Sequence, residues 1–174
     1  KFKFILMFLS ICIPTFNRIH CLNNCLNAIY ISKKNFDHEF EVCISDNCST
    51  ENVEKIIDFY KNKINIKFKK NKRNIGLGKN ILESVSMAEG EYVWIIGNDD
   101  LLLPNTLKRL HQLINTNSEA DYFFINVYEL NSKHIFNCDQ PFDTNNLPSN
   151  MKRWSKLNSS KNLKFFEIIN PDIS

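Results

Sequence analysis

The sequence has few residues that interrupt regular structure, and neither sign of charge dominates it. Only 4 of its 174 residues are glycine and 5 are proline, which favours long helices and strands over a loop-rich fold. Its 22 lysines and arginines against 19 aspartates and glutamates give a net charge of +3, which does not by itself indicate nucleic acid or an acidic membrane as a partner. A hydrophobic fraction of 43% excludes a disordered chain, and the length suits one domain with a sizeable core.

The apolar run Phe4–Ile13 is shorter than the ~20 residues of a membrane-spanning helix. It follows Lys1 and Lys3 as in a secretion signal, but no small-residue cleavage pattern comes after it. We interpret the run as a buried parallel strand, because such strands are continuously apolar.

The cysteines do not form a metal or disulfide framework. The spacings Cys21-x3-Cys25 and Cys43-x4-Cys48 lack a second, zinc-like pair, and a chain of this length does not need disulfides. We interpret all six cysteines as structural thiols in a reducing cytosol.

Apolar segments of two kinds alternate along the chain. Strands are expected at 4–13, 40–46, 64–68, 92–96 and 121–127, and we expect the strand at 92–96 in the centre of the sheet. Between them, helical stripes are expected on these residues: Leu22, Cys25, Leu26 and Ile29; Val53, Ile56, Ile57 and Tyr60; Ile81, Leu82, Val85 and Ala88; Leu107, Leu110 and Ile114. We expect Asn17 to cap the first helix, Ser49 or Thr50 the second, and Pro104 to stand in the first turn of the fourth. This alternation predicts an α/β fold with a mostly parallel central sheet flanked by helices.

In such sheets, ligands bind beyond the carboxyl ends of the strands. Asp99 and Asp100 follow the strand at 92–96, and adjacent carboxylates persist in a crevice if a cation neutralises them. Carboxylate oxygens suit Mg²⁺ or Mn²⁺. The alternative is a solvated turn or a cap for the helix near Pro104.

Two further segments stand at strand ends. Asp46 could accept a hydrogen bond from a ribose or a base, or form an Asx turn at the entry to the next helix. The segment 71–80 (NKRNIGLGKN) combines two glycines with Arg73 and Lys79, which can face phosphate. It matches neither the dinucleotide fingerprint nor the Walker loop.

The stretch 61–73 carries seven basic residues and no acid. We interpret it as an edge strand protected by lysines against aggregation rather than as a nucleic-acid site, because Phe68 is its only aromatic residue. The four histidines form no ligand pattern, and His20 and His111 are expected on helix surfaces.

Four segments in order resemble family 2 glycosyltransferases of the GT-A fold across residues 5–128. They are 10–18 (SICIPTFNR), 44–49 (ISDNCS), 74–80 (NIGLGKN) and 88–100 (AEGEYVWIIGNDD), with Pro104 after them. The last segment looks most like the bacterial branch that adds deoxyhexoses such as abequose to surface polysaccharide.

The resemblance implies a nucleotide-diphospho-sugar donor and a glycan or lipid-linked acceptor, with no nucleic-acid partner. It implies that Mg²⁺ or Mn²⁺ is held by Asp99 and Asp100, that an acceptor hydroxyl attacks with inversion, and that the protein works in the cytoplasm, at the inner face of the membrane or in peripheral association with it. The implied donor-binding residues are Pro14, Thr15, Asn17, Asp46, Lys79, Asn80 and Asn98.

The resemblance divides the chain into a nucleotide-sugar-binding domain (1–130) and a partial acceptor region (131–174). The tail is rich in Asn, Ser and Lys with few apolar residues before 163–169, so we expect a long loop followed by a short helix there, or partial disorder. The catalytic base of the family is a carboxylate in the acceptor region, and none of Asp139, Asp143, Glu167 and Asp172 can be assigned to it. A truncated protein that binds nucleotide-sugars without catalysis is the first alternative, and a nucleotidyltransferase is the second.

Overall fold

The structure, a computed structural model, describes residues 7–154. Its main sheet has four parallel strands in the order β3-β2-β1-β4. The strands are β1 (Leu9–Thr15), β2 (Phe40–Asp46), β3 (Ile66–Lys70) and β4 (Tyr92–Ile95). The chain builds outward from β1 to β3 and then returns to the other side of β1, so the strand order switches between β1 and β4. The predicted α/β fold with a mostly parallel sheet is confirmed.

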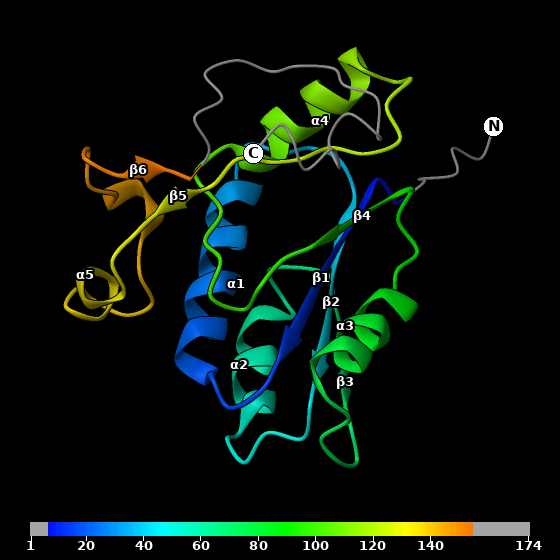
Figure 1. Cartoon of the computed structure of the whole chain (residues 1–174), viewed down its shortest axis with the longest axis vertical. Helices are drawn as coiled ribbons and strands as arrows, with labels where there is room; N and C mark the ends of the chain where they lie inside the picture. The colour runs from blue at the N-terminus through cyan, green and yellow to red at the C-terminus, as the bar shows by residue number, and fades with distance from the viewer. Residues whose placement is uncertain (1–6, 155–174) are drawn as a thin grey trace, which may run out of the picture.

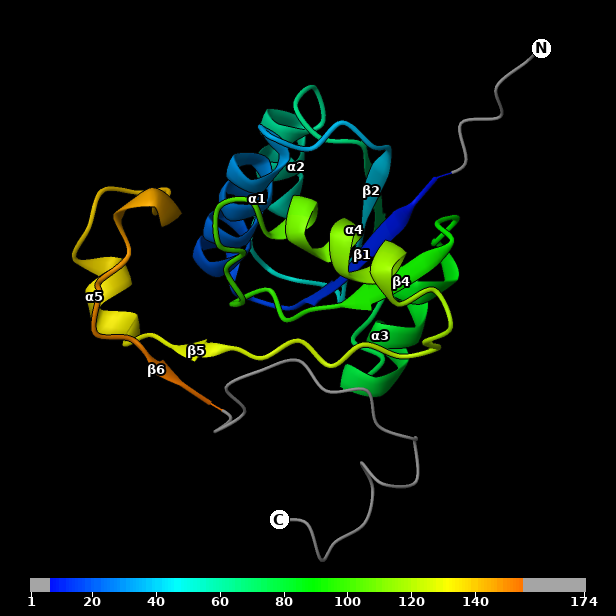
Figure 2. The same ribbon diagram turned by 90° about the horizontal axis from the view of Figure 1, so that it is seen from above.

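Three helices cover one face of the sheet and one helix covers the other (Figures 1 and 2). The first group is α1 (Ile19–Lys33), α2 (Val53–Tyr60) and α4 (Thr106–Thr116), and α3 (Leu77–Ser86) lies opposite. The stripes predicted for α1 and α4 are buried throughout, and Val53, Ile57 and Tyr60 of α2 are buried with them. These side chains and alternate residues of β1 and β2 form the apolar core.

The apolar stripe predicted for α3 is only partly buried. The buried residues of this helix are Asn80 and Ser84, whereas Ile81, Val85 and Ala88 are half-buried and Leu82 is 67% exposed. On the sheet side, Glu41 lies fully buried, 2.8 Å from Lys67 Nζ. Burial alone would raise the pKa of Glu41, but hydrogen bonds from Lys67, Ser10 and a backbone N–H lower it below its usual value.

The helix caps differ from the prediction because the expected capping side chains have other partners. Asn17 Oδ1 accepts from Thr50 N at 2.9 Å, and the N-cap of α1 is Arg18 without a side-chain cap. Ser49 is bonded to Asp46, so Asn52 caps α2 and accepts from Lys55 N. Asn105, which follows Pro104, is the N-cap of α4.

Two strand predictions were wrong in place or kind. The strand at 92–96 was expected in the centre but lies at an edge of the described four-stranded sheet. The segment 121–127 forms no strand, because no described strand pairs with it; only β5 (Tyr128–Glu129) follows, paired with β6 (Lys152–Arg153). A strand without a ladder leaves its backbone groups unpaired, so local β propensity alone does not form one.

The remaining described chain contains α5 (Ser132–Phe136) and the short 3₁₀ helix η1 (Thr144–Asn146). Phe142 is 1% exposed, and its backbone is bonded to Asn24 and Asn27 of α1. The helix predicted near 163–169 lies outside the described residues. All six cysteines are free thiols. Within residues 7–154, no helix is long and apolar enough to cross a membrane.

Candidate functional site

Polar side chains gather where β1, β2 and β4 end. Thr15 and Asp46 are direct neighbours in the register of β1 and β2. From the segment after β4, the Asn98 amide donates a 2.8 Å hydrogen bond to Thr15 Oγ1. Asn98 is 6% exposed and Thr15 is 3% exposed, so this bond is buried. The cluster therefore lies at the switch point, where parallel sheets bind ligands.

Asp46 holds the turn that follows β2. Its carboxylate is fully buried, accepts from Ser49 N at 3.1 Å and from the Ser49 hydroxyl, and lies 3.9 Å from Lys70 Nζ. The Ser49 hydroxyl oxygen in turn accepts from Asn17 N at 2.8 Å. The Asx turn expected as the alternative role of Asp46 is therefore present. The predicted contact of Asp46 with a ribose or base has to form beside this turn.

Asn80 ties α3 to the ends of β1 and β2. Its amide group donates to Ser45 O at 3.0 Å and to Thr15 O at 3.4 Å, and its oxygen accepts from Ser45 Oγ and from the Asn71 amide. Asn80 is 2% exposed. Asn80 therefore holds α3 against the carboxyl ends of β1 and β2.

Asp99 and Asp100 lie exposed at the rim of the same cluster. Asp100 Oδ2 accepts from Gly97 N at 2.7 Å, and Asp99 Oδ2 is 2.9 Å from Arg18 Nη1. Both carboxylates fold back over Gly97: a Cβ added there would lie 2.7 Å from Asp99 Oδ1 and 3.2 Å from Asp100 Oδ2. Both carboxylates therefore lie against Gly97, and a side chain at this position would have to displace them.

Two exposed, adjacent carboxylates suit a divalent cation that is shared with a ligand. Within the described chain, no group of three or more His, Cys, Asp or Glu side chains could hold a metal ion. Mg²⁺ is commonly bound by one or two carboxylates, with phosphate oxygens and water completing the shell. Asp99 and Asp100 supply that number of carboxylates.

The other predicted residues lie at different distances from this cluster. Pro14 is half-buried beside Ser45 in the sheet, and Asn17 bridges to Thr50 at the exposed rim. Lys79 is exposed on the first turn of α3. Asp143 caps η1, and among the described residues neither it nor Asp139 forms an ion pair or hydrogen bond with the cluster. Glu167 and Asp172 lie outside residues 7–154.

Sequence reasoning missed several residues of this site. Arg18, Ser49 and Glu51 make contacts across the strand ends: Arg18 with Asp99, Ser49 with Asp46 and Asn17, and Glu51 with Ile19 N. Asn47 and Asn74 also join, because their side chains are bonded at 2.9 Å and fix the loop before α3. The sequence places all of these beside strand ends, but their pairings depend on the fold.

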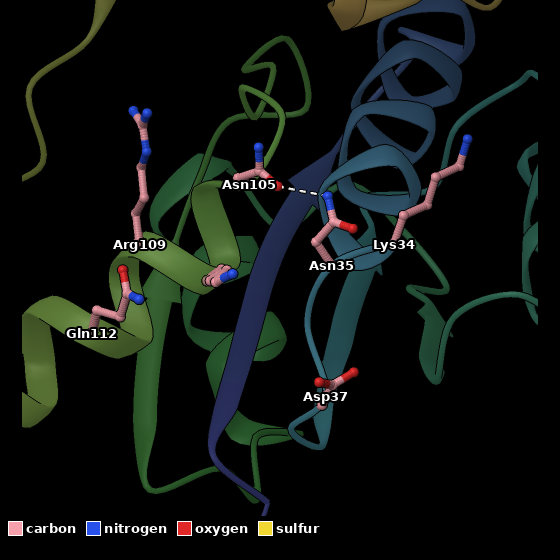
Figure 3. A pocket seen from close by; sticks show the side chains of 7 residues that line it. Lys34, Asn35, Asp37, Asn105, Arg109 and Gln112 are labelled. Atoms are coloured by element: carbon pink, nitrogen blue, oxygen red, sulfur yellow. Dashed lines mark hydrogen bonds between the residues drawn. The ribbon is translucent and has the colours of Figure 1, made fainter.

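A cavity of about 500 Å³ lies at the other end of the sheet (Figure 3). Lys34 and Asn35 near the end of α1 and Asn105 and Arg109 at the start of α4 line it, and Asn35 donates to Asn105 Oδ1 at 2.7 Å. None of the predicted site residues lines this cavity, so the candidate site is the polar cluster at the carboxyl ends.

The basic stretch 61–73 behaves largely as an edge strand. Lys67 pairs with Glu41 and Glu89, Lys69 with Glu83, and Lys70 with Glu54. Its strand, β3, begins two residues later than the predicted start at Ile64, which is instead buried in the core. These acidic partners favour a structural role for the stretch over nucleic-acid binding.

Known proteins resemble this chain in sequence and structure. Abequosyltransferase RfbV of Salmonella typhimurium is 42% identical over 119 residues, which cover 67% of this chain and 35% of RfbV. Poly(ribitol-phosphate) beta-N-acetylglucosaminyltransferase TarS of Staphylococcus aureus is 31% identical over 132 residues, covering 75% of this chain and 22% of TarS. The crystal structure of TarS 1-349 in complex with UDP-GlcNAc matches with a TM-score of 0.59 and 33% identity, over 64% of this chain and 32% of that one.

The chain thus spans about a third or less of the length of these relatives. Residues 10–171 match the sequence profile described as Glycosyl transferase family 2. The resemblance inferred from the four ordered segments is confirmed by this match and by the similarity to RfbV and TarS. The chain belongs to glycosyl transferase family 2 and has the GT-A fold.

Proposed function

We propose that this chain contains the donor-binding part of a glycosyltransferase that moves a sugar from a nucleotide-diphospho-sugar to an acceptor hydroxyl in surface polysaccharide synthesis. The observation that carries the proposal is the placement of Asp99 and Asp100 beside the Thr15–Asn98 bond at the β1/β4 switch point. The names of RfbV and TarS, and the UDP-GlcNAc bound to TarS, support it.

Each residue of the cluster has a role in this proposal. Pro14, Thr15 and Asn17 line the nucleotide, Asp46 orders the turn beside the base and ribose, and Asn98 faces the ribose. Lys79 offers a positive charge to the base or diphosphate, and buried Asn80 holds the strand ends in register. Residues 1–130 then form the donor domain, and residues 131–174 begin the acceptor region.

Asp99 and Asp100 hold the divalent cation, Mg²⁺ or Mn²⁺, whose charge stabilises the nucleoside diphosphate as it leaves the sugar. Gly97 keeps the two carboxylates close together, since any side chain there would displace Asp99 Oδ1. The acceptor hydroxyl attacks the anomeric carbon from the opposite side with the help of a carboxylate base, which inverts that centre. The acceptor is a glycan or a lipid-linked glycan at the inner face of the membrane.

Titration calorimetry tests the donor site directly. The full chain is titrated with UDP, GDP, CDP and dTDP, each with and without Mn²⁺ or Mg²⁺. We expect at least one of the four nucleotides to bind with metal and to bind only weakly without it. We expect Asp99→Asn to reduce the metal-dependent affinity at least about tenfold through loss of a metal ligand. Asp37→Asn at the opposite end of the sheet is the matched control, with unchanged affinity. The proposal fails if none of the four nucleotides binds.

A non-catalytic nucleotide-sugar-binding protein is the second candidate. It is favoured by the fact that, among the described residues, neither Asp139 nor Asp143 contacts the donor cluster. Slow hydrolysis of a bound nucleotide-sugar, or transfer to an added acceptor, separates the two candidates. Donor binding without either reaction supports the second.

A further inference from the structure

Arg18 and Asp99 form an ion pair across the switch point that the donor-binding roles above do not use. Arg18 Nη1 lies 2.9 Å from Asp99 Oδ2, and the two side chains are 59% and 58% exposed. An ion pair this exposed contributes little, because water and salt screen it and both side chains lose freedom in forming it. Asp99 can therefore exchange Arg18 for another cation at small cost.

The backbone around Arg18 is held, so the exchange needs only a side-chain movement. On one side, Asn17 N donates to Ser49 Oγ and Asn17 Oδ1 accepts from Thr50 N. On the other side, Ile19 N donates to Glu51 Oε2 at 2.9 Å. These hydrogen bonds fix the backbone on both sides of Arg18, so only its side chain has to move at the rim between β1 and β4.

The surroundings favour an anion beside Arg18. It precedes α1, a helix of 15 residues with no acidic residue in its first turn and no side-chain cap. The positive end of the helix dipole therefore adds to the charge of Arg18. This end of the helix already binds one anionic group, because the Glu51 carboxylate accepts a hydrogen bond from Ile19 N.

We propose that Arg18 is a donor-positioning residue that exchanges Asp99 for the diphosphate of the donor. This inference rests on the proposed function. With a divalent cation on Asp99, the guanidinium of Arg18 would lose this partner and would turn its planar N–H donors to the phosphate oxygens of the donor. Arg18 therefore competes with the cation alone and cooperates with a cation that carries a diphosphate.

Two titrations of the chain of residues 1–174 test these opposite effects of Arg18 on the cation alone and on the cation with a diphosphate. The first measures Mn²⁺ alone, by its paramagnetic resonance signal. The second measures, at saturating Mn²⁺, whichever of UDP, GDP, CDP and dTDP the wild-type chain binds. For Arg18→Gln we expect Mn²⁺ alone to bind about two- to fivefold more tightly, because its competitor is gone. We expect the nucleotide to bind about tenfold or more weakly, because a charge-assisted contact is lost.

Two further variants control for charge and for folding. Arg18→Lys retains the charge but not the planar donors, so its Mn²⁺ affinity stays near wild type while nucleotide affinity falls partway. Arg109→Gln makes the matched substitution at the opposite end of the sheet (Figure 3) and leaves both affinities unchanged.

A purely structural Arg18 would weaken both ligands together in Arg18→Gln. Unchanged or weaker Mn²⁺ binding by this variant, or undiminished nucleotide binding, overturns the inference while the proposed function stands. If the wild-type chain binds none of the four nucleotides, the proposed function fails first and the inference fails with it.

Discussion

The Asn98 amide donates a buried 2.8 Å hydrogen bond to the Thr15 hydroxyl, and this bond joins residues 83 positions apart at the carboxyl ends of two strands. It fixes the segment after β4 against the end of β1. Asp99 is the next residue, so its position depends on this bond. The stability of the sheet edge and the geometry of the candidate metal ligands are therefore linked through Thr15.

We expect Thr15→Val to lower the free energy of unfolding by about 1–3 kcal/mol, because the buried Asn98 amide loses its acceptor. Affinity for a nucleoside diphosphate should fall as well, since Asp99 is less well placed. Thr15→Ser retains the hydroxyl and should restore most of both properties. Urea denaturation and calorimetry measure the two quantities, and a Thr15→Val protein as stable as wild type would show that the bond contributes little.

Substitutions at Gly97 and Gly90 distinguish an effect on nucleotide binding from an effect on stability. At Gly97 an added Cβ would meet the Asp99 carboxylate at 2.7 Å, and an exposed carboxylate can move aside. At Gly90 an added Cβ would lie 2.6 Å from Ser10 N and 2.7 Å from the Leu9 carbonyl carbon, which are backbone atoms of a central strand. We expect Gly97→Ala to retain stability but lose metal-dependent nucleotide binding, and Gly90→Ala to unfold at clearly lower urea concentration. Equal losses of stability in the two variants would contradict this expectation.

A substitution of Asn80 tests whether its hydrogen bonds stabilise the ends of β1 and β2. Asn80→Asp keeps the shape but replaces the amide donor with an acceptor, so the carbonyl oxygens of Thr15 and Ser45 face a carboxylate. We expect a loss of about 1–3 kcal/mol in the free energy of unfolding. Asn62→Asp, an exposed asparagine after α2, is the matched control. Similar stability in both variants would argue against a structural role for the Asn80 amide.

The sequence predicted the parts of this fold that depend on local pattern. Continuous apolar runs identified β1 and β2, because both faces of these strands are buried. Helical stripes identified α1 and α4, because each of these helices buries one apolar face. The stripe on α3 misled in part, since Asn80 and Ser84, rather than Leu82, are buried in that helix. The segment 121–127 has strand composition, yet a strand also requires a partner.

The candidate site shows the same division. Motif order located Thr15, Asp46, Asn98 and Asp99 at strand ends, where the structure brings them together. The pairing of Arg18 with Asp99 was not predictable, because it joins loops that meet only when β4 returns beside β1.

His111 also escaped prediction, and it gives the stability of the protein a pH dependence. It was expected on the surface of α4, but its ring is half-buried, stacked on His38 at 3.7 Å between centroids and edge-on to Phe8 at 4.8 Å. Burial, and then the charge of His38, lower the pKa of His111 below its usual 6.5. The unfolded chain therefore binds a proton that the folded chain resists, so stability is lost as pH falls from 6.5 towards the lowered pKa.

We expect the urea midpoint of the wild-type protein to fall between about pH 7 and pH 5, and His111→Gln to reduce this dependence because the titrating ring is gone. His20→Gln, at an exposed position on α1, should leave the dependence unchanged. Glu41 does not contribute to the change between about pH 7 and pH 5. Its pKa is lowered, so the stability that it gives is lost only below the usual value of 4.5. If His111→Gln lost stability with pH as steeply as wild type, the stacked pair would not be the source, and the titration of another histidine would have to be followed by NMR instead.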